Sequence, residues 1–310
     1  MTTAEHATVL REEAVAALSI RADGIYIDAT FGRGGHSRAI LAGLGPRGRL
    51  LVIDRDPEAI AVAQELSQTY PQVSVVHGAF ADLEMIARRE GLHGQVAGIL
   101  LDLGVSSPQL DRAERGFSFA KDGPLDMRMD PTQTLNAADW INAAPEKEIA
   151  RVLYEYGEER HSRRMARRIV EERKSEPIRS TGRLAEIVKE ANPAWEKDKH
   201  PATRAFQGIR IFINSELEQL SRGLEQALAI LARGGRLVVI SFHSLEDRIV
   251  KKFIAMQTKG DNFPRDLPVT QSMLNPTLRA LGKAIRPGTA EVARNPRARS
   301  AVMRVAEKIA

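Results

Sequence analysis

The chain has 310 residues, of which 43% are hydrophobic and 27% are charged, a composition typical of a globular protein large enough for two domains. It has no run of 18 apolar residues and no basic, apolar leader, so we expect a cytoplasmic protein rather than a membrane or secreted one. Because cysteine is absent, disulfides, thiolate metal sites and cysteine nucleophiles are excluded.

The net charge of +5 is distributed unevenly along the chain. Residues 248–310 hold 13 Lys and Arg against 4 Asp and Glu, whereas the preceding residues hold 32 against 36. A basic segment on a near-neutral body favours contact with a polyanion, and nucleic acid is the obvious candidate. A solvated basic tail is the alternative interpretation.

Short apolar segments alternate with helical patterns in the first third of the chain. The predicted strands are residues 24–28, 49–54, 73–77 and 96–102, and three of them end in an aspartate. Pro57 stands where a first-turn proline of a helix belongs. Strands that alternate with helices in this way predict an α/β fold with a parallel sheet covered on both faces.

The pattern changes after residue 102. Residues 136–229 read as helical throughout, and the strand pattern returns at residues 235–240 and again at 301–305. The stretch from about 260 to 299 is basic and rich in Pro and Gly. We therefore expect a helical domain inserted between the fourth and fifth strands, with the insert at residues 108–207 and the sheet domain at residues 1–107 and 208–310.

A glycine-rich loop follows the first predicted strand. Gly32, Gly34 and Gly35 lie where open α/β sheets bind ligands, and glycine lets the backbone approach a ligand closely. Asp54 ends the next strand, 20 residues after Gly34, which is the usual place for a carboxylate that binds a ribose diol. The alternative is a tight turn followed by an acidic helix cap.

The loop departs from the dinucleotide fingerprint. Ser37 stands where that fingerprint has its third glycine, and Asp28 places a carboxylate directly before the loop. A carboxylate is unfavourable beside a pyrophosphate but suits a cationic amino-acid group. The residues therefore favour S-adenosyl-L-methionine over a nicotinamide dinucleotide.

Further candidate site residues follow the later strands. Phe80, with Asp82 close by, either packs on an adenine whose amino group Asp82 accepts or belongs to the core. Asp102 ends the fourth strand and faces the same crevice, from which many such enzymes hold the atom to be methylated. His243 follows the fifth strand and is either an active-site wall or a turn histidine held by Glu246 or its neighbour.

Several longer motifs run through nearly the whole chain. They occupy residues 6–10, 28–37, 54–57, 101–111, 115–119, 123–129, 156–160, 200–204, 241–248 and 295–300. Together they resemble the ribosomal RNA small subunit methyltransferase H family, of the MraW type. That bacterial family methylates N4 of a cytidine in the decoding centre of 16S ribosomal RNA.

The resemblance implies a Rossmann-like doubly wound methyltransferase sheet with an inserted all-helical domain for substrate recognition. It also implies S-adenosyl-L-methionine as cofactor and 16S rRNA, within the small ribosomal subunit, as partner. The assignment of His36 and Gln109 to the site depends mainly on this resemblance. The cofactor-binding positions fall here on Gly34, Gly35, His36, Asp54, Phe80, Asp102 and Gln109.

Methyl transfer to an exocyclic amine needs groups that hold the nitrogen and accept its proton. Our hypothesis is that Asp102, or a carbonyl just beyond it, binds the amine, with His243 as a second acceptor. The absence of cysteine excludes the covalent route to cytosine C5, which leaves an amine or a hydroxyl as acceptor. The sequence offers no cluster of metal ligands.

Three other functions stay open on the residues alone. They are a nicotinamide-dependent oxidoreductase, a non-catalytic RNA-binding assembly factor, and a methyltransferase that acts on DNA or protein.

Candidate RNA contacts lie in both parts of the chain. Phe117 and Phe119 either stack on an extruded base or pack inside the insert. Arg297 and Arg299, in the basic segment, are candidates for phosphate contact. The arginine-rich stretch 163–168 is flanked by glutamates, so we expect an ion-paired, solvated helix face there, with RNA contact as the alternative.

Overall fold

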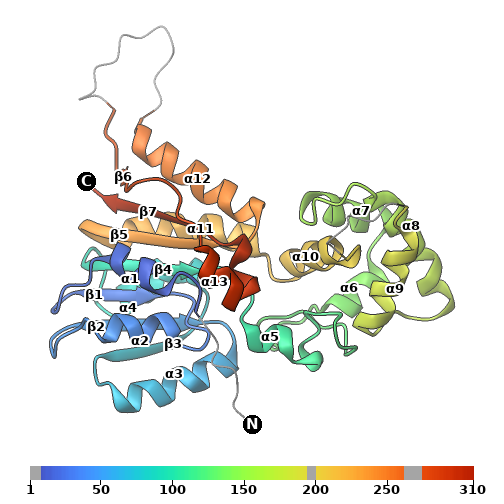
Figure 1. Cartoon of the computed structure of the whole chain (residues 1–310), viewed down its shortest axis with the longest axis horizontal. Helices are drawn as coiled ribbons and strands as arrows, with labels where there is room; N and C mark the ends of the chain where they lie inside the picture. The colour runs from blue at the N-terminus through green and yellow to red at the C-terminus, as the bar shows by residue number, and fades with distance from the viewer. Residues whose placement is uncertain (1–7, 194–199, 262–273) are drawn as a thin grey trace, which may run out of the picture. The chain divides into compact units, whose positions relative to one another are not determined.

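The computed structural model describes residues 8–193, 200–261 and 274–310, and the chain forms two compact units (Figure 1). The sheet unit comprises Met1–Gly104 and Leu217–Ala310, and the helical unit comprises Val105–Glu216. Our expected boundary between residues 207 and 208 falls inside helix α10 (Ala202–Ile213). That helix stays whole within the helical unit because Phe206 and Ile209 are part of its core.

The sheet unit is built on a seven-stranded sheet of order β3-β2-β1-β4-β5-β7-β6. The first five strands in the sequence pair in parallel, and β7 pairs antiparallel with both β5 and β6. The predicted α/β class is confirmed, and the doubly wound order of β1 to β5 is that of Rossmann-like sheets. The strands are β1 (Ile25–Asp28), β2 (Arg49–Asp54), β3 (Val73–His77), β4 (Val96–Asp102), β5 (Leu231–Ser241), β6 (Leu278–Ala280) and β7 (Val302–Lys308).

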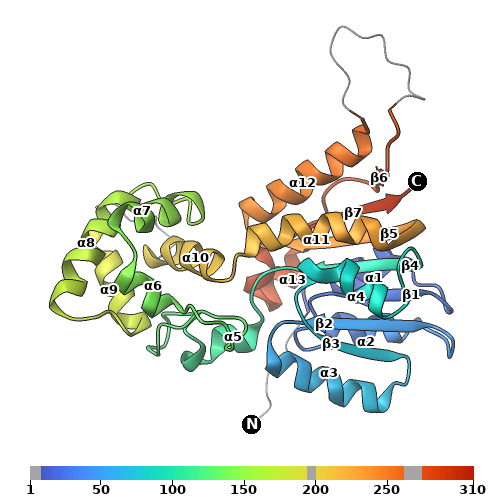
Figure 2. The same ribbon diagram turned by 180° about the vertical axis from the view of Figure 1, so that it is seen from behind.

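Helices cover both faces of this sheet, as Figures 1 and 2 show from opposite sides. Alternate residues of the strands point to opposite faces. Ile27 and Leu51 pack with one set of helices, and Tyr26 and Leu50 pack with the other. The first set is α4 (Leu83–Arg89), α11 (Glu216–Ile230) and α12 (Ser244–Lys259); the second is α1 (Arg11–Leu18), α2 (Gly35–Leu41) and α3 (Pro57–Thr69).

The C-terminal part of the sheet differs from the sequence prediction. The short strand β6 was not expected within the basic, Pro- and Gly-rich stretch, and it forms because β7 offers it an antiparallel partner. β5 begins at Leu231, four residues before the predicted start, and the register of its pairing with β4 shifts between Val96 and Gly98. Further along lie the helix α13 (Thr289–Arg294) and the 3-10 turn η4 (Pro296–Ser300).

The helical unit has its own hydrophobic core. Polar side chains cap two of its helices: Asn136 and Ser180 accept hydrogen bonds from the first turns of α6 (Ala137–Ala143) and α9 (Thr181–Ala191). None of the helices in the described parts of either unit is long and apolar enough to cross a membrane. The helices of this unit are α5 (Ser107–Asp111), α6 (Ala137–Ala143), α7 (Glu146–Glu155), α8 (Ser162–Ser175), α9 (Thr181–Ala191) and α10, with the 3-10 turn η2 (Ala113–Arg115).

Candidate functional site

The candidate site lies at the carboxyl edge of the parallel strands in the sheet unit. The chain runs outward from β1 to β2 and β3 on one side, and from β4 to β5 on the other. The switch point between β1 and β4 is where open α/β sheets bind their ligands. Asp28 and Asp102 end these two strands, and Asp54 ends the neighbouring β2. The three predicted aspartates therefore end neighbouring strands at one edge.

The glycine-rich loop between β1 and α2 is tightly folded. Gly34 has a φ of 72°, and a Cβ added there would lie 2.6 Å from the ring of Phe31. A Cβ on Gly35 would lie 1.8 Å from the hydroxyl of Thr8. A side chain at Gly34 would be strained by its left-handed backbone, and at both positions it would collide with a neighbour. This backbone geometry explains the glycines that the sequence placed at the site.

Asp54 holds this loop through its carboxylate. Its Oδ2 accepts a hydrogen bond from the backbone N–H of Gly32 at 2.8 Å, and its Oδ1 accepts one from that of Asp56 at 2.9 Å. Burial raises the pKa of Asp54 to about 6, although these two N–H groups act in the opposite direction. An ionised carboxylate has about four acceptor positions, so it retains capacity for a further donor.

Asp28 is fixed inside the loop rather than directed at solvent. It is only 1% exposed; its Oδ2 accepts the hydroxyl of Ser37 at 2.6 Å and its Oδ1 the N–H of Thr30 at 3.3 Å. Burial raises the pKa of Asp28. Ser37, which we read only as a missing third glycine, therefore ties α2 to the end of β1. The pairing of an acid with a serine nine residues later was the signal in the sequence for this bond.

The side chains of His36 and Asp102 lie close together at the switch point. The Nε2 of His36 lies 3.4 Å from Oδ2 of Asp102, and the imidazole is 4% exposed against 24% for the carboxylate. Within the described residues, both ring nitrogens of His36 and Oδ1 of Asp102 lack hydrogen-bond partners. Burial lowers the pKa of His36, but Asp102 and Asp28 outweigh it, so the pKa is raised overall. The backbone N–H of Asp102 donates to Oγ1 of Thr30 at 2.6 Å, which joins the two strand ends.

Phe80 lies just beyond β3, in the turn η1 (Phe80–Asp82). Its ring is partly buried against Gly223 of α11, where an added Cβ would lie 2.5 Å from the ring. Asp82 lies 3.4 Å from the guanidinium of Arg222. The adenine contacts that we expected of Phe80 and Asp82 stay predictions.

His243 follows β5 and precedes α12. Its Nε2 lies 3.2 Å from Oε1 of Glu246, whose other oxygen accepts the backbone N–H groups of Phe242 and His243. The acid that follows Glu246, Asp247, pairs instead with Arg304 at 2.7 Å. The geometry agrees with the turn histidine that we weighed against an active-site wall, and a catalytic role stays a prediction.

Three predicted residues belong to the helical unit. Gln109 is buried, and its side-chain oxygen accepts the backbone N–H of Ser106 at 2.9 Å at the start of α5. Phe117 lies in the hydrophobic core of this unit. Phe119 is partly buried, with ring centroids 4.6 Å from His200 and 4.9 Å from Phe206. The buried position of Phe117 agrees with the packing alternative rather than with stacking on a base.

Arg297 and Arg299 lie in η4 of the sheet unit. Both side chains belong to exposed residues, and the backbone N–H of Arg297 donates to Oδ1 of Asn295 at 3.2 Å. The exposed position of both residues is compatible with phosphate contact, which stays a prediction.

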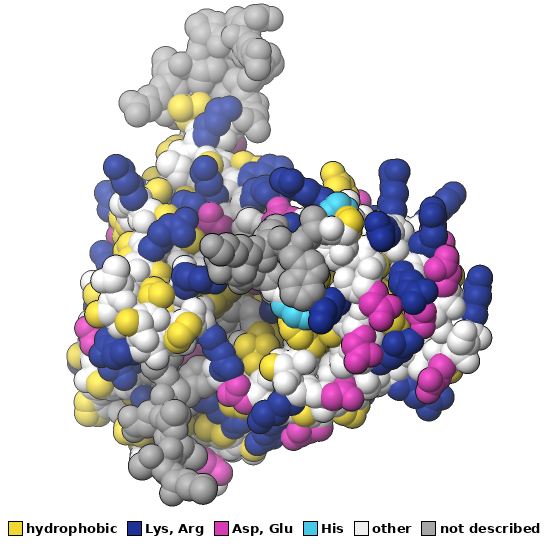
Figure 3. Space-filling model, turned by 45° about the vertical axis from the view of Figure 1, so that its right-hand side comes forward, with side chains coloured by type: hydrophobic (Ala, Val, Ile, Leu, Met, Phe, Trp, Pro, Cys, Tyr) yellow, Lys and Arg dark blue, Asp and Glu magenta, His cyan; other side chains and the backbone are white. Residues whose placement is uncertain are grey.

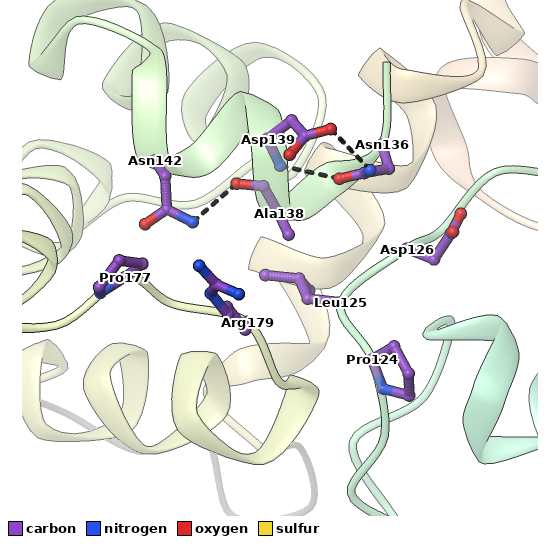
Figure 4. Close-up of a pocket in the computed structure, with 9 residues that line it drawn as sticks. All are labelled: Pro124, Leu125, Asp126, Asn136, Ala138, Asp139, Asn142, Pro177 and Arg179. Carbon is purple, nitrogen blue, oxygen red and sulfur yellow. Dashed lines mark hydrogen bonds between the residues drawn. The ribbon is translucent and has the colours of Figure 1, made fainter. Parts of the chain in front are cut away.

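A pocket of about 410 Å³ opens in the helical unit (Figure 4). Several of its polar side chains bond to each other or to nearby backbone: Nδ2 of Asn136 donates to Oδ2 of Asp139, and Nδ2 of Asn142 to the carbonyl of Ala138, both at 2.8 Å. None of the residues predicted from the sequence is among those described as lining it, and we assign it no role. Its lining residues are Pro124, Leu125, Asp126, Asn136, Ala138, Asp139, Asn142, Pro177 and Arg179.

Comparison with known proteins identifies a matching sequence family and similar solved structures. The sequence model of the MraW methylase family matches residues 3–309. Among solved structures, the chain is similar to a candidate rRNA methylase from Clostridium thermocellum, with 11% identity, 100% of both chains covered and a TM-score of 0.46. An rRNA methylase from Streptococcus thermophilus matches with 10% identity, over 97% of this chain and 95% of that one, at a TM-score of 0.44.

Proposed function

Because the chain belongs to the MraW methylase family, we propose that it methylates the exocyclic N4 amine of a cytidine in the decoding centre of 16S ribosomal RNA. The family inferred from the motifs is confirmed, and with it a methyltransferase whose cofactor is S-adenosyl-L-methionine. The observation that best supports the proposal is the position of Asp102. Its carboxylate, with one oxygen unpartnered among the described residues, lies at the switch point of the sheet.

The residues at the sheet edge fit this cofactor. Asp54 retains acceptor capacity suitable for a ribose diol, and the unpartnered Oδ1 of Asp102 suits a donor group. The partly exposed carboxylate of Asp102 at the switch point disfavours a pyrophosphate there, which argues against the nicotinamide alternative. When bound, S-adenosyl-L-methionine supplies a methyl group on a positively charged sulfur.

The acceptor amine of a cytosine is a weak nucleophile because its lone pair is delocalised into the ring. A carboxylate that accepts a hydrogen bond from the amino group orients the nitrogen and then takes up its proton. We assign this role to Asp102 as the catalytic residue. His36 is a positioning residue, since its imidazole lies behind the carboxylate at 3.4 Å and is almost fully buried.

The substrate side of the proposal uses exposed groups in both units. Arg297 and Arg299 contact phosphates of the RNA, and the helical unit contributes to substrate recognition. Phe119, which is partly buried, is the better of the two phenylalanines for contact with a base.

Methyl transfer to isolated small ribosomal subunits tests the proposal directly. Subunits from a strain that lacks this enzyme are incubated with the protein and methyl-labelled S-adenosyl-L-methionine, and the modified nucleotide is mapped. We expect one N4-methylcytidine in the decoding centre. Label at a ring carbon, in DNA or in protein would refute the proposed acceptor, and absence of label from every acceptor would favour a non-catalytic assembly factor.

A further inference from the structure

Helix α8 of the helical unit carries arginines on its exposed surface. Its buried residues include Met165, Ala166 and Ile169, which pack into the core of the unit. Arg163, Arg164 and Arg167 are all exposed. Residues three or four positions apart are neighbours on a helix, so these side chains lie close together. We call these three residues the arginine face.

The arginine face is not paired with acids, although the sequence predicted an ion-paired surface. That expectation is correct for Arg168, which lies 2.7 Å from Glu172 and 3.2 Å from Glu190. It is wrong for the arginine face, whose three side chains make no hydrogen bond or ion pair with any residue that the structure describes. Two nearby glutamates are engaged elsewhere: Glu172 also pairs with Arg183, and the buried Glu159 accepts the backbone N–H of His161.

The position of these charges is unfavourable for the helix itself. The first turn of α8 contains no acidic residue, and the positive end of the helix dipole lies there beside Arg163 and Arg164. Like charges three and four residues apart add repulsion. A local arrangement that opposes helix stability without a compensating contact is expected where a residue serves binding.

We propose that the arginine face binds the phosphodiester backbone of the ribosomal RNA substrate, an inference that rests on the proposed function. Guanidinium groups match phosphate geometry with two parallel hydrogen bonds and remain charged at every physiological pH. Figure 3 shows exposed Lys and Arg side chains on the helical unit, with Asp and Glu between them. The arginine face itself is defined by three exposed arginines in the first half of α8.

The contact is with the RNA backbone rather than with bases. No aromatic residue lies among the exposed positions of α8, so the face offers no platform for stacking. Phosphate contacts fix the orientation of a bound nucleic acid without reading its sequence. We expect the arginine face to orient the RNA on the helical unit without selecting the nucleotide that is modified.

The test compares two triple variants of the full-length protein that each remove three positive charges. The first is Arg163→Gln, Arg164→Gln and Arg167→Gln. The matched control is Arg151→Gln, Arg168→Gln and Arg183→Gln, which removes three arginines of the same unit that pair with glutamates. Affinity for 16S rRNA transcribed in vitro and for small ribosomal subunits is measured between 50 and 300 mM salt.

Affinity for RNA falls with salt, and each phosphate contact contributes about 0.7 to 0.9 to the steepness of log affinity against log salt concentration. We expect the arginine-face variant to make this dependence shallower by about 2. The control is expected to change the slope by less than about 0.5, because its arginines are already neutralised by acids. A third variant with lysine at the three positions of the face keeps the charge and should keep the slope.

Several results would overturn the inference. These are an unchanged slope in the arginine-face variant, an equal loss in the control, or an equal loss in the lysine variant. Weaker binding to subunits with unchanged binding to naked rRNA would instead assign the face to a ribosomal protein. The inference and the proposed function fail separately: wild-type protein that binds RNA through these arginines but methylates no cytidine N4 refutes only the function.

Discussion

The acid-lined edge of the sheet unit and the arginine face of the helical unit use charge in opposite ways. At the edge, Asp28 and Asp54 accept hydrogen bonds from the chain itself, and Asp102 faces a buried imidazole. On α8, three guanidinium groups have no partner among the described residues. A site of the first kind depends on the precise position of each atom, whereas a surface of the second kind depends on the number of charges and on salt.

The comparison also predicts which substitutions matter. One change at the edge removes a group that no neighbour replaces, so its effect is large and hardly depends on ionic strength. Changes on an exposed basic surface are graded, because each arginine contributes one of several similar contacts. The following experiments are arranged from the largest expected effect to the smallest.

Asp102→Asn is expected to lower the rate constant of methyl transfer by about 100- to 1,000-fold, because an amide cannot take up the proton of the acceptor amine. The measurement is a single-turnover assay on small subunits at saturating S-adenosyl-L-methionine. Asp23→Asn is the control, since it removes an exposed carboxylate that pairs with Arg47. If Asp102→Asn methylates at the wild-type rate, Asp102 is not the base. The acid-lined edge would then not differ from the arginine face in its sensitivity to a single substitution.

Asp54 should leave a pH signature on stability. Its folded pKa of about 6 lies above the ordinary aspartate value of 3.8, so the folded state holds this proton more tightly than the unfolded state. The free energy of unfolding therefore decreases as the pH rises from about 3.8 to about 6, by at most about 3 kcal/mol. Urea unfolding of the cofactor-free protein from pH 3.5 to 7.5 should show this slope, and Asp54→Asn should lack it. Equal pH dependence in both proteins would contradict the assignment.

The Asp54 carboxylate should also make cofactor affinity depend on pH. Affinity should increase as the pH rises, whereas folding stability decreases. Only the ionised form has full acceptor capacity for a diol, so affinity for S-adenosyl-L-methionine should fall below about pH 6 in the wild type. Asp54→Asn should bind weakly at every pH. Calorimetric titration at pH 5 and pH 7.5 measures both expectations.

Gly34→Ala tests whether the glycine-rich loop needs a residue without a side chain at this position in order to bind the cofactor. A side chain in the left-handed conformation costs about 1 to 2 kcal/mol, and here it would also meet the ring of Phe31. We expect a melting temperature lower by about 2 to 8 °C and weaker cofactor binding. Gly91→Ala is the matched control, with a φ of 68° and nothing within 4 Å of an added Cβ. It should lose stability alone; weaker cofactor binding in both variants would mean that strain, not the loop, is responsible.

The double variant Arg297→Gln and Arg299→Gln should have the smallest effect. Loss of two phosphate contacts lowers the salt slope of RNA affinity by about 1.5, and cofactor binding stays unchanged. The matched control is Arg47→Gln with Arg279→Gln, which removes two arginines of the sheet unit that pair with acids. Equal slopes in the two double variants would remove η4 from the RNA-binding surface.

The parts predicted correctly from the sequence are those with local causes. β1 to β4 follow from short apolar runs, three of which end in an aspartate, and the glycines of the loop follow from backbone geometry within a few residues. The placement of three aspartates at one edge needs only the rule that parallel strands end together.

The parts that could not be predicted depend on contacts distant in sequence. The partial pairing of the arginines on α8 is decided by α9, which supplies Glu190 and Arg183 to the network around Glu172. β6 exists only because β7 pairs with it, 24 residues later. The burial of His36 behind Asp102 needs β4 beside β1, although 66 residues separate the two side chains.

The place of β7 in the sheet has a consequence for biosynthesis. This strand, Val302–Lys308, lies between β5 and β6 and is made after all the other strands of its unit. On the translating ribosome, the helical unit is complete once Glu216 has emerged, whereas the sheet must wait for nearly a hundred further residues. At roughly 5 to 20 residues per second, that interval lasts on the order of 5 to 20 seconds. From the emergence of β5 until β7 pairs with it, β5 has an open edge at which the unfinished sheet can misassociate.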